Sequence, residues 1–339
     1  MATPAAFYLF FYAREALPTS LFTSYLMNSS ILGLHHITAI ANSAKRNYDF
    51  YTQVLGLRMV KKTVNFDDPT TYHFYYGDEK GTPGTLLTFF PWEGIGPGRN
   101  GIGMATEIGY SVPKGSLDQW AERFRKLDVS MGERTERFNE TILPFSDPDG
   151  LALTLLATNQ AENPAVWETA EVKRNMATQG FHSVTLTLQN IAATAKILTD
   201  VLGYRQVAQE GNRYRFQTDA VSTASIVDLL EEPEGILGRN AAGTNHHVAF
   251  RVANEAIQME FREKILESGL QITSKINRDY FFSLYFREPG GVLFEIATDN
   301  PGFTVDEPLT ELGSQLKLPQ PYEGSRAKIE KGLPPLDTN

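Results

Sequence analysis

The chain has no cysteine among its 339 residues. This absence excludes disulfide bonds, thiolate metal sites and cysteine nucleophiles. Any bound metal must therefore be held by nitrogen and oxygen ligands. Histidine is also scarce, with only six residues, so the position of each one can be weighed separately.

Positive charge and long apolar runs are scarce as well. The chain has 31 lysines and arginines against 40 aspartates and glutamates, a net charge of −9, so we expect no nucleic-acid partner. The apolar residues 5–13 follow no basic segment and end at Arg14 and Glu15, well short of a membrane span. We therefore expect no membrane partner, a cytoplasmic location, and an N-terminal extension over residues 1–30 that is a candidate flexible segment.

Two sequence patterns recur along the chain at one constant offset. Gly33–Thr38 and Val54–Arg58 match Gly180–Thr185 and Val201–Arg205. Between the two motifs of each copy, apolar residues lie three and four positions apart, which predicts one amphipathic helix in each copy.

A second similarity relates the ends of the two halves, where Asp147–Thr154 parallels Glu288–Glu295 as a turn followed by a final strand. The sequence thus predicts an α+β fold of four β-α-β-β-β units, at about residues 33–92, 103–157, 180–233 and 244–298. A unit of this size buries little surface alone, so we expect the units to pair into two cup-shaped mixed β-sheets.

The domain boundaries follow from the repeats and from the composition between them. With 42% hydrophobic and 21% charged residues, the chain can build two substantial cores. We expect one half at 31–158, with the first two units, and one at 180–300, with the last two. Residues 159–179 would be a linker, and the proline-rich residues 301–339 a C-terminal arm.

Four of the six histidines form two His-His pairs at predicted strands, and one member of each pair is a candidate metal ligand. His36 and His247 join Glu295, which lies on the last predicted strand. Two histidines and one carboxylate are the ligand set of non-haem Fe(II) sites, which keep further positions open. Because Ser183 and Thr154 occupy the matching positions of the third and second units, the first and fourth units must meet in one metal cup.

The motifs of residues 33–310 resemble those of the vicinal oxygen chelate superfamily, which includes glyoxalases and extradiol ring-cleaving dioxygenases. Its hydroquinone and chlorohydroquinone 1,2-dioxygenase branch is the one most similar to the motifs of this chain, at Leu34–Thr38, Gly81–Gly84, Pro113–Leu117, Ile226–Leu230, Asn277–Arg278 and Pro289–Glu295. The resemblance implies a mononuclear Fe(II) enzyme, with Mn(II) as the alternative metal. Its partners would be O2 and a small aromatic substrate, whose ring is opened next to a hydroxylated carbon.

The resemblance also implies roles for individual residues. His36, His247 and Glu295 match the metal ligands of the family. Five further positions match residues around its metal, namely His35, Thr38, His246, Arg278 and Tyr285.

Physical chemistry gives these five residues plausible tasks. Arg278 and Tyr285 could stabilise negative charge on substrate oxygens, and His35, or else His246, could transfer a proton at neutral pH. Strand alternation places His35 and His246 on the face opposite the ligands, so both could instead only hydrogen-bond at the rim. The simpler interpretations are a surface salt bridge for Arg278 and core packing with a satisfied hydroxyl for Tyr285.

Three other polar residues have simpler interpretations. We expect His73 and His182 to be structural, and Asp228 to belong to a structural network because it lies in the third unit.

Other functions stay open at this point. A catechol extradiol dioxygenase would use the same metal, although ligands from the first and fourth units favour the hydroquinone branch. A glyoxalase-like isomerase or thiol transferase would commonly need an additional carboxylate ligand, and a sequestration module would need no ligand triad. The sequence leaves open a homo-oligomer and the ring substituents that are accepted.

Overall fold

The computed structural model describes residues 30–159 and 163–336. The N-terminal extension expected over residues 1–30 thus lies outside the described residues, except for Ser30. In these two described ranges, no helix is long and apolar enough to cross a membrane.

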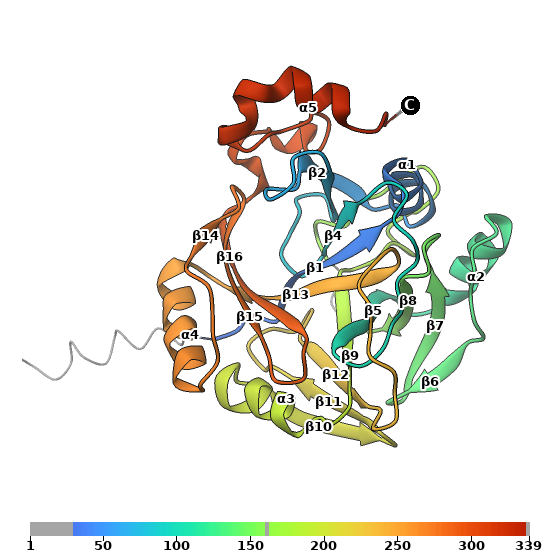
Figure 1. The fold of residues 1–339 in the computed structure, drawn as a ribbon. Coiled ribbons are helices and arrows are strands. Elements are labelled where there is room, and N and C mark those ends of the chain that lie inside the picture. The colour runs from blue at the N-terminus through green and yellow to red at the C-terminus, as the bar shows by residue number, and fades with distance from the viewer. Residues whose placement is uncertain (1–29, 160–162, 337–339) are drawn as a thin grey trace, which may run out of the picture.

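Two sheets of eight strands form the body of the molecule (Figure 1). The first sheet, here called the first cup, has the strand order β14 (Ile276–Asn277), β15 (Phe281–Arg287), β16 (Leu293–Pro301), β13 (Thr244–Val252), β1 (Leu34–Ala41), β4 (Leu86–Pro91), β3 (Tyr72–Gly77) and β2 (Arg58–Val64). The second sheet, the second cup, has the order β10 (Arg205–Glu210), β11 (Arg213–Gln217), β12 (Ile226–Glu231), β9 (Phe181–Leu188), β5 (Met104–Pro113), β8 (Ala152–Thr158), β7 (Glu140–Ser146) and β6 (Thr135–Arg137).

The strand orders confirm the predicted α+β fold and its pairing of units. The first cup joins the first unit to the fourth through the antiparallel pair β1–β13, and the second cup joins the second unit to the third through β5–β9. Each sheet therefore takes one unit from either side of the predicted linker. The boundaries proposed for the sequence halves and the linker stay a prediction.

One helix follows the first strand of each unit, as the apolar spacing predicted. These helices are α1 (Ala44–Asp49), continued by a π-helical turn over Phe50–Val54, α2 (Leu117–Lys126), α3 (Ala192–Lys196), continued by a π-helical turn over Ile197–Val201, and α4 (Glu255–Glu267). The side chain of Asn254 caps α4 by accepting a hydrogen bond from the amide of Ile257. On α2, Leu117, Trp120 and Phe124 are buried at helical spacing.

The C-terminal residues cover one edge of the first cup. They form 3-10 turns at Phe303–Val305, Leu309–Glu311 and Gln320–Ser325, followed by α5 (Arg326–Gly332). Figure 1 shows this segment above β2. The ammonium group of Lys61, which is fully buried on β2, pairs with Glu307, and the Tyr322 hydroxyl donates to the carbonyl of Phe66 at 2.6 Å.

The central strands are buried on both faces, because one face of each sheet packs on helices and the other lines the cup. All eight residues of β1 are buried. On the helix side of the first cup, Phe250 and Phe294 pack ring against ring at 4.8 Å, in one core with Phe261 of α4. Full burial of each such ring contributes about 1.5–3 kcal/mol. This packing fixes which side chains of β1, β13 and β16 face the concave side.

The two cups meet where their central strands begin. Gly33, with φ of +77°, precedes β1, and a Cβ atom there would lie 2.4 Å from the carbonyl oxygen of Ala224. Only glycine permits this approach, which lets the Leu34 amide donate to the same carbonyl. The recurrence of Gly33 as Gly180 in the sequence repeat therefore has a structural cause.

Candidate metal centre

Three ligand-type side chains meet on the concave face of the first cup. His36 on β1, His247 on β13 and Glu295 on β16 are 2%, 5% and 0% exposed. The Nε2 atoms of the two histidines are 3.3 Å apart, and they lie 3.2 Å and 3.0 Å from the same oxygen, Oε2 of Glu295. His36 thus meets two residues that lie more than 200 positions further along the chain.

Strand register brings the three residues together. His36 pairs with Ala249 across the antiparallel β1–β13 ladder, and Ala249 pairs with Glu295 across the parallel β13–β16 ladder. His247 lies two residues before Ala249, and therefore on the same face, opposite Thr38. The predicted meeting of the first and fourth units in one cup thus has a direct basis in the backbone pairing.

The geometry and protonation of the triad fit a divalent metal. First-row metals bind nitrogen and oxygen at about 2.0–2.2 Å, so ligand atoms at right angles lie about 3 Å apart, as these three do. Burial acts to raise the pKa of Glu295, but the neighbouring His36 and His247 hold it well below its usual value. Oε1 of Glu295 accepts a hydrogen bond from Ser283, whereas Oε2 is buried without a hydrogen-bond donor. A buried carboxylate oxygen in this state is suited to a cation.

His35 lies behind His36 and outside the cavity in front of the triad. Its Nδ1 is 2.9 Å from Nδ1 of His36, and its Nε2 is 3.1 Å from the carbonyl oxygen of Thr298. Both ring nitrogens are therefore engaged, and burial lowers the pKa of His35 well below its usual value. These contacts favour an orienting role for His35 over the proton transfer expected from sequence.

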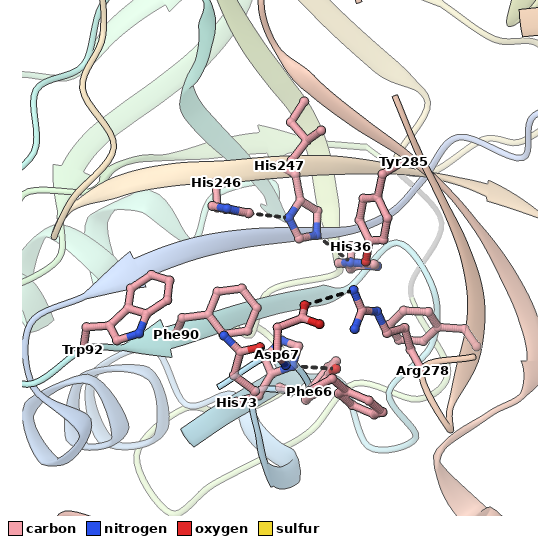
Figure 2. Close-up of a pocket in the computed structure, with 14 residues that line it drawn as sticks. His36, Phe66, Asp67, His73, Phe90, Trp92, His246, His247, Arg278 and Tyr285 are labelled. Carbon is pink, nitrogen blue, oxygen red and sulfur yellow. Dashed lines mark hydrogen bonds and ion pairs between the residues drawn. The ribbon is translucent and has the colours of Figure 1, made fainter. Parts of the chain in front are cut away.

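His246 occupies the corresponding place beside His247. The Nδ1 atoms of the two rings are 2.8 Å apart, and burial, followed by the proximity of His247, lowers the pKa of His246 to about 3. Unlike His35, His246 lines the cavity in front of the triad (Figure 2).

A cavity of about 350 Å³ opens in front of the two histidine ligands. Its walls are mainly aromatic, with rings from Phe66, Tyr75, Phe90, Trp92, Phe281 and Tyr285. Such a pocket suits a flat apolar molecule that carries a few polar groups.

Arg278 and Tyr285 lie together at this cavity, as Figure 2 shows. The guanidinium of Arg278 lies 5.5 Å from the Tyr285 ring and donates to Asp67 at 3.5 Å. Arg278 thus forms the salt bridge considered from sequence and also lines the cavity. Burial, and then the charge of Glu295, raises the pKa of Tyr285, so its hydroxyl stays protonated.

Thr38 is fully buried on the concave face beside the triad, with its hydroxyl oxygen 2.9 Å from Nε2 of His247. Of the five residues expected around the ligands, Thr38, His246, Arg278 and Tyr285 therefore lie on the cavity side of the site. His35 alone lies behind it.

The sequence interpretation missed the contribution of β3 and of the loop before it. His73, expected to be structural, lines the cavity and is hydrogen-bonded to Tyr75 and Thr88. The signal was present in the alternation of β3, because His73 and Tyr75 are two residues apart and so share a face. The loop residues Asn65 and Asp67, by contrast, carry no repeat or motif that could have revealed them.

The other polar residues singled out from sequence lie in the second cup. His182 is 2.8 Å from a carboxylate oxygen of Glu140, and Asp228 accepts two hydrogen bonds from Arg215. Within the described residues, His36, His247 and Glu295 form the one group of three ligand-type side chains close enough to share a metal.

The fold and this site together define a class of protein. A model of the Glyoxalase/Bleomycin resistance protein/Dioxygenase superfamily matches residues 33–155 and 180–296, and the chain belongs to this family. The chain is 44% identical over 304 residues to the provisionally named ring-cleaving dioxygenase MhqE of Bacillus subtilis (strain 168), covering 90% of this chain and 99% of that protein. It is 34% identical over 303 residues to the chlorohydroquinone/hydroquinone 1,2-dioxygenase of Sphingobium indicum, covering 88% and 94%. The resemblance found in the sequence motifs is confirmed.

Solved structures show the same fold. The crystal structure of a provisionally assigned dioxygenase from Bacillus subtilis matches with a TM-score of 0.88 and 41% identity, covering 91% of this chain and 99% of that chain. Glyoxalase I from Zea mays matches with a TM-score of 0.59 at 14% identity, covering 79% and 92%, which concerns the fold alone.

Proposed function

We propose that the protein is an Fe(II)-dependent ring-cleaving dioxygenase that inserts both atoms of O2 into a hydroquinone-type ring, next to a hydroxylated carbon. The observation that carries the proposal is the buried triad of His36, His247 and Glu295, which faces an aromatic cavity of about 350 Å³. Relatives named as ring-cleaving and hydroquinone dioxygenases support the substrate class. Mn(II) is the alternative metal for the same ligands.

The triad would leave a metal accessible on its cavity side. Bound Fe(II) would supply a Lewis acid and a one-electron path between the ring and O2. The ligands come from strands that are buried on both faces, so they are held in place before the metal binds. The described residues offer no fourth carboxylate or imidazole to the group, which favours a dioxygenase over a glyoxalase-like isomerase.

The cavity residues would orient the substrate and stabilise charge. The aromatic walls can hold a single ring by face and edge contacts while excluding water. The positive charge of Arg278 and the protonated hydroxyl of Tyr285 can stabilise a substrate oxygen that has lost its proton. Thr38 and His246 can hydrogen-bond to oxygens bound beside His247.

The remaining properties follow from the same assignment. The partners would be O2 and a small aromatic substrate, without nucleic acid or membrane. We also propose a cytoplasmic location, on the basis of the acidic, cysteine-free sequence. Assembly into a homo-oligomer forms no part of the proposal.

The decisive experiment measures oxygen uptake by protein loaded anaerobically with Fe(II), with 2-methylhydroquinone, chlorohydroquinone and catechol offered in parallel. We expect uptake with the hydroquinones, loss of uptake in His36→Ala, and unchanged uptake in Ser183→Ala, the matching position of the second cup. Preference for catechol would move the protein to the catechol branch. No uptake with any ring despite bound iron would overturn the proposal.

A further inference from the structure

A chain of hydrogen bonds runs along the concave face of the first cup and ends at a ligand atom. The Tyr75 hydroxyl is 2.9 Å from Nδ1 of His73, and Nε2 of His73 is 3.1 Å from the hydroxyl of Thr88. Thr88 is 2.7 Å from the hydroxyl of Thr38, which is 2.9 Å from Nε2 of His247. All five residues are buried, with exposures of 0–8%.

The direction of donation along this series of hydrogen bonds is set by Tyr75. Among the described residues, the Tyr75 hydroxyl has one hydrogen-bond partner, Nδ1 of His73. A buried O–H without an acceptor is costly, so Tyr75 donates and Nδ1 of His73 accepts. Neutral His73 then carries its proton on Nε2 and donates to Thr88. Burial lowers the pKa of His73 well below its usual value, in accord with a neutral ring.

Each following group has one remaining way to bond. Because Thr88 accepts from His73, its own proton goes to Thr38, and the Thr38 proton goes to Nε2 of His247. His247 must then keep a bare Nε2 and a protonated Nδ1, in place of the alternative in which Nε2–H donates to Oε2 of Glu295, 3.0 Å away. Its Nδ1–H has an acceptor 2.8 Å away in Nδ1 of His246. An unprotonated Nε2, directed at the point where the three ligands meet, is the form that binds a metal.

The other histidine ligand reaches the same form by a separate route. The carbonyl of Thr298 can only accept, so Nε2 of His35 donates to it and Nδ1 of His35 is bare. This nitrogen accepts the proton of Nδ1 of His36, which leaves Nε2 of His36 bare. Two separate series of hydrogen bonds, made by different residues, thus select the same tautomer at both histidine ligands.

We propose that His73 and Thr88 are positioning residues of the metal centre. Tyr75 donates to His73, His73 donates to Thr88, and Thr88 donates to Thr38. The Thr38 hydroxyl is therefore a fixed hydrogen-bond donor toward the point where the three ligands meet. Without metal, its proton holds His247 in the metal-binding tautomer. When Nε2 of His247 is engaged by metal, the same proton is free for an oxygen of the substrate, and this second step rests on the proposed function.

The second cup shows that the direction of hydrogen-bond donation at this threonine is not fixed by the fold. Strand register makes Thr185 the counterpart of Thr38, and Arg213 the counterpart of His73. Arg213 donates to the hydroxyl of Thr185 at 2.7 Å, so that threonine is held as an acceptor by a direct contact. The register position of Thr88 itself is occupied by Asp228 in the second cup, so Thr185→Val is the nearest control, because it removes a buried threonine hydroxyl from the concave face of the other sheet.

The first test needs no activity. Long-range 1H–15N NMR of histidine rings in the metal-free protein reports which nitrogen carries the proton. We expect the proton on Nε2 of His73 and on Nδ1 of His247 in the wild type. Thr88→Val should shift His247 toward the Nε2–H form, and Thr88→Ser should restore it. A proton on Nδ1 of His73, or unchanged tautomers in Thr88→Val, would overturn the proposal.

The second test measures metal affinity, with Mn(II) alone as the calorimetric probe. We expect Thr88→Val to weaken binding by about 10-fold, as is typical of groups that orient a ligand. Thr88→Ser and Thr185→Val should bind as the wild type does. Equal affinities for Thr88→Val and Thr185→Val would contradict the proposal, because both remove the same buried group.

The third test concerns the substrate. At saturating metal, Thr88→Val should lower kcat for 2-methylhydroquinone without changing KM, and Thr88→Ser should recover it. An unchanged kcat would overturn the role of the Thr38 proton toward substrate. If the wild type itself consumes no O2, the proposed function fails, whereas the tautomers and the Mn(II) affinities still decide the role of His73 and Thr88.

Discussion

The two cups share one strand plan but differ in how their concave faces satisfy buried charge. In the first cup, the positions that meet at the centre carry His36, His247 and Glu295, and Oε2 of Glu295 has no hydrogen-bond donor. In the second cup, register places Ser183 and Thr154 at the positions of His36 and Glu295. The shared backbone plan alone therefore does not produce the candidate metal centre.

The second cup satisfies its carboxylates with arginine. Arg215 donates to both oxygens of the fully buried Asp228 at 2.9 Å and 3.1 Å, and it also contacts Glu140. The side chain of Arg137 pairs with Glu107, the counterpart of His247. In the first cup, a buried carboxylate oxygen has no donor and is suited to a cation. In the second cup, arginine side chains neutralise the carboxylates. The two cups therefore differ less in the presence of carboxylates than in whether a buried carboxylate oxygen lacks a donor, as it does at the candidate metal centre.

The largest expected effect, on oxygen uptake, follows from removing the negative charge of Glu295. Glu295→Gln keeps the shape of the side chain but removes its charge, so oxygen uptake with 2-methylhydroquinone should fall to the rate of metal-free protein. Thermal unfolding provides the second measurement, since a metal present at 100 times its Kd stabilises by about 2.7 kcal/mol. This stabilisation by Mn(II) should vanish in Glu295→Gln and persist in Thr154→Ala. Metal-dependent stabilisation of Glu295→Gln would contradict the comparison.

The next largest effect should fall on stability rather than activity. Asp228→Asn removes the fully buried charge partner of Arg215 and leaves it with Glu140 alone, and breaking a buried pair costs about 3–5 kcal/mol. Urea unfolding should show this loss, while Mn(II) affinity at low temperature stays at the wild-type value. Arg205→Gln, which removes an exposed ion pair with Asp219, is the control and should leave the urea midpoint unchanged. Weakened Mn(II) binding in folded Asp228→Asn would show that the cups are coupled.

Acid should also weaken the second cup through Glu140. Burial acts to raise the pKa of this carboxyl, but His182 and Arg215 lower it to about 2. The folded-state pKa lies below the unfolded value of about 4.3, so the stabilisation is present above that pH and is lost as pH falls toward 2. Urea titrations between pH 5 and pH 2 should show a smaller loss of stability in Glu140→Gln. Parallel curves for the two proteins would contradict this role.

The smallest expected effect tests the covering of the first cup by the C-terminal segment. Tyr322→Phe removes the hydrogen bond to the carbonyl of Phe66, a cavity residue, at a cost of about 1 kcal/mol. KM for 2-methylhydroquinone should rise by up to about fivefold with kcat retained. Tyr214→Phe, on β11 of the second cup, should leave KM unchanged. A fall in kcat alone would place Tyr322 in another role.

The sequence predicted the larger architecture because the repeats carry it. The similarity between units located His36 in the first and Glu295 in the fourth, and the loss of ligand types at Ser183 and Thr154 excluded the middle units. Strand alternation then placed Thr38 and the ligands on one face. These inferences need only periodicity and comparison within the chain.

The environment of the ligands was harder to predict, because it depends on local irregularity and on loops. The ladder between β1 and β13 shifts register between Leu34 and His36, so His35 breaks the alternation and turns toward the carbonyl of Thr298. Arg278 meets Asp67 through side chains from two loops that the repeats do not relate. No sequence motif predicts a hydrogen bond to a backbone carbonyl or a contact between two loops.

The pairing of outer units in one cup and inner units in the other has a consequence for the order of events during synthesis. The second cup is built from neighbouring units and can close once residues up to about 233 have emerged. The strand β1 can pair with β4 on one edge early, but its other edge stays unpaired until β13 has emerged, and β16 then pairs with β13. The inner cup would then be a finished platform on which the outer units close, and the metal-binding triad would be the last part of the molecule to assemble.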